Sequence, residues 1–176
     1  MNPSRLVLIS AFLLVSVAVT LAVVLPVISG NVAVGTRDFI AILNGWNEVP
    51  SVVSTGIGWT MISISPDGRS ITFEMRYNGI RDVTMAHIHL GKDGHIGAVA
   101  VWLCGGPRPP CPPSPGTVTG TITADDVLGI PAQGLSRGDL ASLIAAIRNG
   151  AAYVNVHTTA FPAGEIRGQF RPLGTP

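Results

Sequence analysis

Three of the four histidines in this 176-residue chain lie on segments in which every second residue is isoleucine or valine. His87 and His89 flank Ile88, so in a β-strand both imidazoles point to one face and the isoleucine points to the other. His157 ends a similar run that begins at Tyr153, with valines at the intervening positions. If the two strands are neighbours, three imidazoles converge. Such a donor set suits Zn²⁺ or Cu²⁺ and leaves one coordination position open.

Glu165 extends this candidate site, because a carboxylate can serve as a fourth ligand or orient a ligating imidazole. A competing interpretation makes no use of metal. Buried polar side chains are usually satisfied by neighbouring protein groups, so the histidines could form a structural cluster with Asn155, Thr158 and Glu165. Arg167 shares a strand face with Glu165 and belongs to the same predicted polar cluster. Both interpretations stay open at the level of sequence.

An enzymatic function has little support in the sequence. No Gly-x-Ser-x-Gly motif is present, and no cleft that would activate a carboxylate such as Glu165 can be located. The glycines between Gly91 and Gly97 lack the Gly-Lys-Ser/Thr ending of a phosphate-binding loop. The net charge is +1 and Lys92 is the single lysine, whereas a nucleic-acid surface needs a basic patch. We therefore expect a non-enzymatic protein that binds no nucleic acid.

The N-terminal segment predicts a link to the membrane. Leu6–Ile28 contains no charged residue, and 23 residues in a helix extend about 34 Å, enough to cross a hydrocarbon core of about 30 Å. The run exceeds the 7–15 apolar residues typical of a cleaved signal. We therefore interpret residues 1–30 as a single-pass transmembrane anchor, with a cleaved signal as the alternative. In either case the remaining domain lies on the extracytoplasmic side of a cell membrane or is secreted.

Residues 31–36 form a short linker, and residues 37–172 carry the alternation and turn signals of an all-β domain. The clearest hairpin joins two alternating runs through Pro66-Asp67-Gly68. One α-helix is predicted near 136–149, where leucines and isoleucines recur at helical spacing. Short connections and one helix indicate an antiparallel, Greek-key-like sandwich or barrel. Trp59 and Trp102 fall in predicted strands and are expected in the core, whereas Trp46 falls in a loop.

The two cysteines, Cys104 and Cys111, enclose a proline- and glycine-rich loop. On the outward side of a membrane, two cysteines so placed predict a disulfide. A pair of free thiols would require a reducing compartment. The Cys-x-x-Cys spacing of a thiol oxidoreductase is absent.

A set of short motifs, found in order along roughly residues 37–171, resembles the chordin (CHRD) domain family. The matching segments are Leu43–Pro50, Ala86–Gly91 with Gly94 and Gly97, Gly120–Asp126, Ile147–Gly150, Tyr153–Thr158 and Pro162–Gln169. This resemblance implies an extracellular all-β domain. The sequence thus predicts a membrane-anchored CHRD module that binds an extracellular protein or glycan, or serves surface architecture. The alternative is a metal-binding and redox-active domain built on His87, His89 and His157.

Overall fold

The computed structural model describes residues 36–173. The predicted anchor and most of the linker lie outside the described residues. Within residues 36–173, no helix has the length and apolar character needed to cross a membrane.

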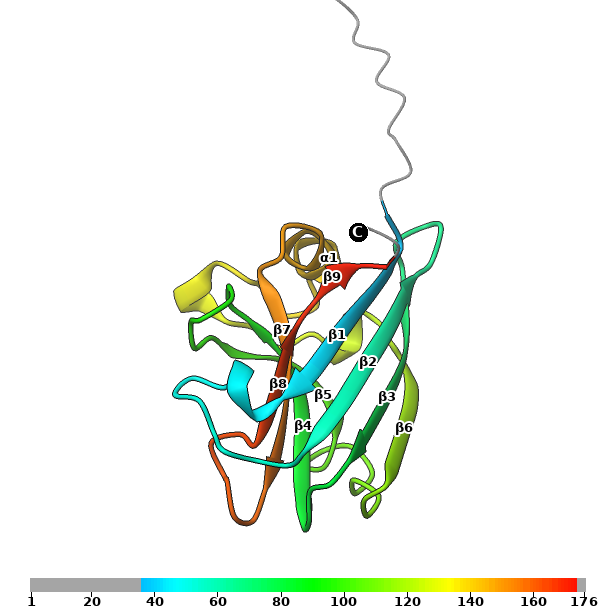
Figure 1. Cartoon of the computed structure of the whole chain (residues 1–176). Coiled ribbons are helices and arrows are strands. Elements are labelled where there is room, and N and C mark those ends of the chain that lie inside the picture. Colours follow the sequence, from blue (N-terminus) through cyan, green and yellow to red (C-terminus); the bar gives the residue numbers. More distant parts are fainter. Residues whose placement is uncertain (1–35, 174–176) are drawn as a thin grey trace, which may run out of the picture. The chain divides into compact units, whose positions relative to one another are not determined.

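The described chain forms one antiparallel sheet that curls into a nearly closed barrel (Figure 1). Hydrogen-bonded neighbours follow the order β5-β4-β7-β8-β1-β2-β3-β6, and β9 adds to β1. Neighbours that are distant in sequence are typical of Greek-key connections. The strands are β1 (Asp38–Asn44), β2 (Ile57–Ile64), β3 (Ile71–Asn78), β4 (Val83–Leu90), β5 (Ala98–Cys104), β6 (Gly116–Ile122), β7 (Ala152–Thr158), β8 (Ile166–Gln169) and β9 (Arg171–Pro172). The all-β prediction is therefore confirmed in its barrel form.

Alternation along each strand separates the barrel interior from its outer face. In the β2–β3 hairpin, Thr60 pairs with Met75 and Ile62 with Phe73, and these side chains are buried. Between them Glu74 and Arg76 point outward and form an ion pair of 2.6 Å. The same rule places Ala86, Ile88, Val154, Val156 and Ile166 in the apolar core. Side chains on the opposite face of β4 and β7 therefore point away from the barrel interior.

One α-helix, α1 (Leu140–Arg148), packs its apolar stripe into the core. The sequence placed this helix near 136–149, and the observed helix begins later. Asp139 is its N-cap, because its side chain accepts a hydrogen bond of 2.9 Å from the Ser142 backbone N–H. Gly138 precedes the cap with a φ of 80°, a left-handed conformation that prevents the helix from extending backward. The predicted stripe is confirmed at Leu140, Leu143, Ile144 and Ile147.

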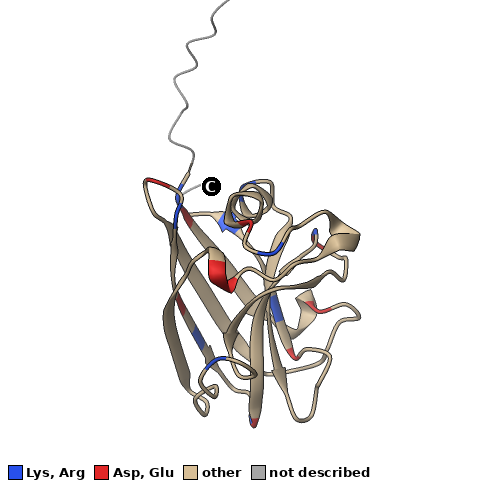
Figure 2. Ribbon diagram, turned by 180° about the vertical axis from the view of Figure 1, so that it is seen from behind, with Lys and Arg blue, Asp and Glu red and all other residues tan. Residues whose placement is uncertain are grey.

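Three short 3₁₀ helices occupy loops: η1 (Gly45–Asn47), η2 (Ala124–Asp126) and η3 (Pro131–Gln133). Trp46 in η1 is exposed, as predicted. Trp59 and Trp102 are only half-buried, so their assignment to the core was wrong. Both are outward-facing, because β2 buries Thr60 and β5 buries Val101 on the interior side. Charged residues are sparse, and the blue and red segments of Figure 2 are scattered over the ribbon.

Candidate functional site

The three histidines that alternate along β4 and β7 share one outward face of the sheet. The two strands pair so that His87 lies opposite Asn155, His89 opposite Tyr153, and Met85 opposite His157. Although this face points away from the barrel interior, the histidines are only 3%, 8% and 7% exposed. Loops before β5 and after β7 cover them, since each loop supplies a carbonyl to one ring.

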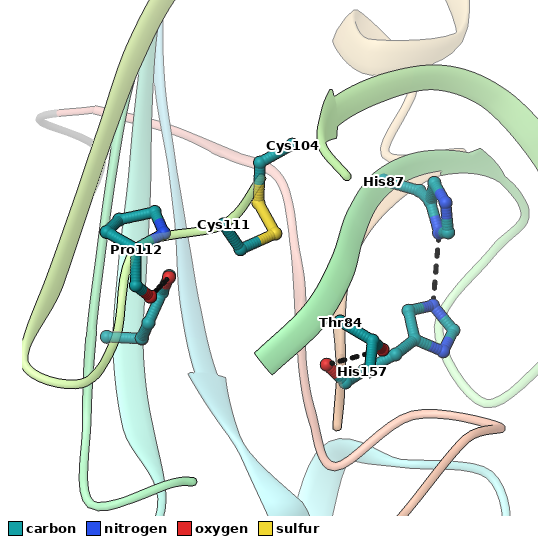
Figure 3. The surroundings of a disulfide bond; sticks show 7 residues. Thr84, His87, Cys104, Cys111, Pro112 and His157 are labelled. Atoms are coloured by element: carbon teal, nitrogen blue, oxygen red, sulfur yellow. Dashed lines mark hydrogen bonds between the residues drawn. A yellow bond between two sulfur atoms is a disulfide. The ribbon is translucent and has the colours of Figure 1, made fainter. Parts of the chain in front are cut away.

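The three imidazoles converge, as their alternation predicted. His87 Nδ1 lies 3.1 Å from His157 Nε2, and Figure 3 shows the two rings facing one another from adjacent strands. One nitrogen from each of His87, His89 and His157 can be chosen so that all three lie within 4.8 Å of one another. We refer to these three residues as the histidine site.

Backbone carbonyls fix the protonation of two rings. His89 Nδ1 lies 3.0 Å from the Gly97 carbonyl oxygen, and His157 Nδ1 lies 3.0 Å from that of Pro162. A carbonyl only accepts, so both Nδ1 atoms carry the hydrogen and both Nε2 atoms present a lone pair. The same outer contact orients imidazoles that bind metals. The Nε2 atoms of His87 and His89 are buried and have no hydrogen-bond partner in the described structure.

Burial keeps the histidine site neutral. Desolvation, followed by the neighbouring histidines, lowers the pKa of His87 from 6.5 to about 3. Desolvation likewise lowers the pKa of His89 to about 4, although its hydrogen bond to Gly97 acts in the opposite direction. The pKa of His157 is lowered by burial too. Neutral imidazoles are the form that binds metal ions, so no proton has to be removed near neutral pH.

Aromatic rings flank the histidine site. Trp102 and His87 make an edge-to-face contact at a centroid distance of 4.2 Å, and Tyr153 stacks on His89 at 4.8 Å. On the other side of Tyr153, the Arg167 guanidinium lies 3.5 Å from the ring centroid. Arg167, Tyr153 and His89 thus form a three-layer stack. These flanking residues hold the His87 and His89 rings in place.

The remaining residues of the predicted site separate into distinct contacts. Glu165 lies outside the set of converging donors, because its carboxylate accepts hydrogen bonds of 2.7 Å from Ser54 and Thr158. Asn155 donates a hydrogen bond of 2.7 Å to Glu48. Arg167 donates to backbone carbonyls of the loop that covers the site. Within residues 36–173, it takes part in none of the ion pairs.

Sequence reasoning gave Glu48 and Ser54 little weight, although both contact the predicted polar cluster. Each lies in the loop between β1 and β2, which has no periodicity from which a position could be inferred. The signal that pointed to Glu48 was its place in the Asn47-Glu48-Val49-Pro50 motif. Tyr153 shared a predicted face with His157, but its stacking on His89 depends on the strand register.

The predicted disulfide is confirmed, and it lies beside the histidine site. Cys104 ends β5, directly opposite Ala86 of β4, and bonds to Cys111 in the following loop (Figure 3). The bond closes the loop that contains Gly106, where a β-carbon would collide with the Trp102 ring. The disulfide therefore holds this loop against the tryptophan that contacts His87.

A separate hollow of about 560 Å³ lies over β1, β2, β3 and the start of β6. Its lining includes Ile42, Ile57 and Trp59, and the two isoleucines are largely exposed. The Arg76 guanidinium lies 5.4 Å from the centroid of the Trp59 ring. The lining is mostly apolar, in contrast to the polar face that carries the histidines.

The barrel and its ordered motifs agree with a comparison against protein families. The model of the CHRD domain matches residues 39–170, which is most of the chain. The chain therefore belongs to the CHRD domain family. Membership supports an extracellular type of binding or structural module. A search of curated proteins found no match, and neither did a search of solved structures.

Proposed function

We propose that this chain is a membrane-anchored, extracytoplasmic CHRD module that binds a divalent transition metal ion, zinc or copper, at the histidine site. The observation that carries the proposal is the convergence of three buried imidazoles, in which His89 Nε2 presents a lone pair that has no partner. Leaving such an atom unsatisfied costs about 1–3 kcal/mol. A bound metal would make use of this lone pair together with one nitrogen from each of the other two rings.

The donor chemistry fits this assignment. Three neutral imidazoles with one open position suit Zn²⁺ and Cu²⁺. The separation of 3.1 Å between His87 Nδ1 and His157 Nε2 is close to the roughly 3.3 Å expected for two ligands of a tetrahedral ion. Two ligands with bonds of about 2.1 Å cannot be more than about 4.2 Å apart. Because the donors span 4.8 Å, the most separated pair has to approach when the ion binds.

A second candidate function is purely structural, and a specific observation favours it. The histidine rings already make hydrogen bonds to one another and to the Gly97 and Pro162 carbonyls. These bonds tie β4, β7 and two loops together, which a surface module requires even without metal. The two functions differ in what happens when zinc or copper is added.

Metal analysis of the purified full chain tests the proposal. After reconstitution with Zn²⁺ or Cu²⁺ and removal of free ions, we expect one metal ion per chain. His89→Ala and His157→Ala should lose the ion, whereas His95→Ala should retain it, because His95 is exposed and outside the site. A chain that holds no stoichiometric metal, and whose histidine variants only lower thermal stability, would establish the structural function instead.

The location of the module is tested separately. N-terminal sequencing of the mature protein should find residues 1–30 retained, and the protein should resist alkaline extraction from membranes. A mature N-terminus near residue 30 would show that the segment is a cleaved signal. Protease protection in intact cells should place the CHRD domain outside the cytoplasm.

A further inference from the structure

Glu48 is a buried carboxylate that lies close to the histidine site but outside its set of donors. Its side chain is 7% exposed, and its Oε1 accepts a hydrogen bond of 2.7 Å from Asn155 Nδ2. Burial raises the pKa of Glu48 from 4.5 to about 7, and the charge of Arg167 and hydrogen bonds from Val49 and Asn155 only partly oppose this effect. Near neutral pH the folded chain therefore holds Glu48 in both protonation states.

Asn155 connects Glu48 to the histidines. It stands directly opposite His87 on β4, and it shares its strand face with His157 two positions further along β7. Its Oδ1 is buried without a partner, as are His87 Nε2 and His89 Nε2. Three polar atoms without partners thus belong to neighbouring positions on one face of two paired strands. Buried polar groups seldom lack partners in this way unless a ligand or water is held between them.

The backbone is adapted to this contact at Gly164. Its φ is 131°, a conformation that favours glycine. A β-carbon at this position would collide with the Asn155 amide and lie 2.7 Å from Glu48 Oε1. Glycine therefore keeps the space in which the Glu48–Asn155 hydrogen bond forms.

We infer that the Glu48–Asn155 pair is the proton-linked outer shell of the metal site, in which Glu48 orients Asn155 and balances the charge of the bound cation. This inference rests on the proposed function. Three imidazoles bring no negative charge, so the ion would otherwise keep its full charge among buried side chains, which is unfavourable. Binding of the ion favours the carboxylate form, and the proton leaves Glu48 for the solvent. Loss of this proton changes the charge of the protein by −1, which partly balances the +2 charge of the ion.

Other ionisable groups near the pair have different partners. Glu165, which immediately precedes β8, is held by Ser54 and Thr158 through two hydroxyl hydrogen bonds. Arg167 on β8 carries a positive charge, which cannot balance that of a metal ion. Its guanidinium donates hydrogen bonds to loop carbonyls. The paired strands that flank Asn155 carry the ionisable residues His87 and His89 on β4, His157 on β7 and Arg167 on β8, and the positive charge of Arg167 acts on Glu48.

Calorimetric titration of the full chain with Zn²⁺ at pH 6, 7 and 8, in buffers of different ionisation enthalpy, tests the inference. For the unaltered chain we expect about half a proton to be released per ion at pH 7, and an affinity that rises with pH. Glu48→Gln keeps the carbonyl that accepts from Asn155, so the fold should survive. It should release no proton at pH 7 and bind zinc about tenfold more weakly at pH 8. Glu74→Gln, on the far side of the barrel, is the matched control and should behave like the unaltered chain.

The outcomes separate this inference from the proposed function. If the unaltered chain binds zinc but Glu48→Gln changes neither the affinity nor the proton release, the inference fails and the metal site stands. If the unaltered chain binds no zinc, both fail. Should the variant not fold, a zinc affinity of the unaltered chain that is constant between pH 6 and 8 would by itself overturn the inference.

Discussion

His87 Nδ1 and His157 Nε2 lie 3.1 Å apart, although the two residues are 70 positions apart in the sequence. This separation suits a hydrogen bond between two neutral imidazoles. It also comes close to the spacing of two nitrogen ligands on a tetrahedral metal ion. One geometry therefore serves a structural cluster and a metal site, and a decision between them depends on adding the ion.

Zinc should stabilise the folded chain. At a free concentration of about 100 times its dissociation constant, an ion that binds only the native state adds about 2.7 kcal/mol to the free energy of unfolding. For a domain of this size the melting temperature should rise on the order of 10 °C. Chelation with EDTA should reverse the shift, and His89→Ala should abolish it while His95→Ala preserves it. A melting temperature that zinc does not change would contradict the metal proposal.

The strands and the convergence of the histidines were predictable because both follow from alternation. Residues at every second position of β4 and β7 share a face, and the interior alternation of Ala86 and Ile88 sets which face that is. The disulfide was predictable because only two cysteines exist.

The rest depended on loops and on strand register. Glu48 and Ser54 reach the polar face from an aperiodic loop, so no spacing rule could place them. The separation of Glu165 from the histidines is set by two hydroxyl partners, one of which lies 111 residues away. The start of α1 was misplaced because Ser136 and Asp139 are both good caps, and only the left-handed Gly138 between them decides in favour of the later one.

Acid should unfold the metal-free chain progressively from about pH 6.5 downward. In the unfolded chain the histidines take up protons near pH 6.5, whereas in the folded chain His87 and His89 do so only near pH 3 and 4. Their contribution to stability is therefore complete above pH 6.5 and is lost as pH falls. By pH 4 the loss is on the order of 3 kcal/mol for each residue. Urea denaturation between pH 4 and 7 measures this slope, which His89→Phe should reduce and His95→Phe should not.

In the metal-free chain, the titration of Glu48 should change stability with pH in the direction opposite to that of the histidines. Its pKa is about 7 when folded and near 4.5 when unfolded, so the folded state holds the extra proton between these values. This contribution is complete below pH 4.5 and is lost as pH rises through 7. Glu48→Gln has no titrating carboxyl group, so its stability does not fall in this way. Relative to the unaltered chain, the free energy of unfolding of the variant should rise by up to about 3 kcal/mol between pH 5 and 8. A difference in stability that stays constant across this range would show that Glu48 is not the titrating group.

The disulfide should stabilise the domain independently of metal. Cys104 and Cys111 close a loop of about eight residues, for which chain entropy predicts about 2.5 kcal/mol. The double substitution to serine should lower the free energy of unfolding by about this amount. Reduction with dithiothreitol should have the same effect on the unaltered chain and none on the double variant. Zinc binding by the double variant should persist but weaken, because Trp102, which packs against this loop, contacts His87.

The stack of Arg167, Tyr153 and His89 should contribute more through its ring than through its hydroxyl. The Tyr153 hydroxyl accepts a hydrogen bond of 3.1 Å from the Gly97 N–H, so Tyr153→Phe should cost about 1 kcal/mol. Tyr153→Leu also removes the ring that separates a buried guanidinium from an imidazole, and should cost about 3 kcal/mol. In a double-mutant cycle with Arg167→Met, the leucine variant should show coupling of about 1–2 kcal/mol and the phenylalanine variant almost none. Equal coupling for both would mean that the hydroxyl, and not the face of the ring, links Tyr153 to the guanidinium.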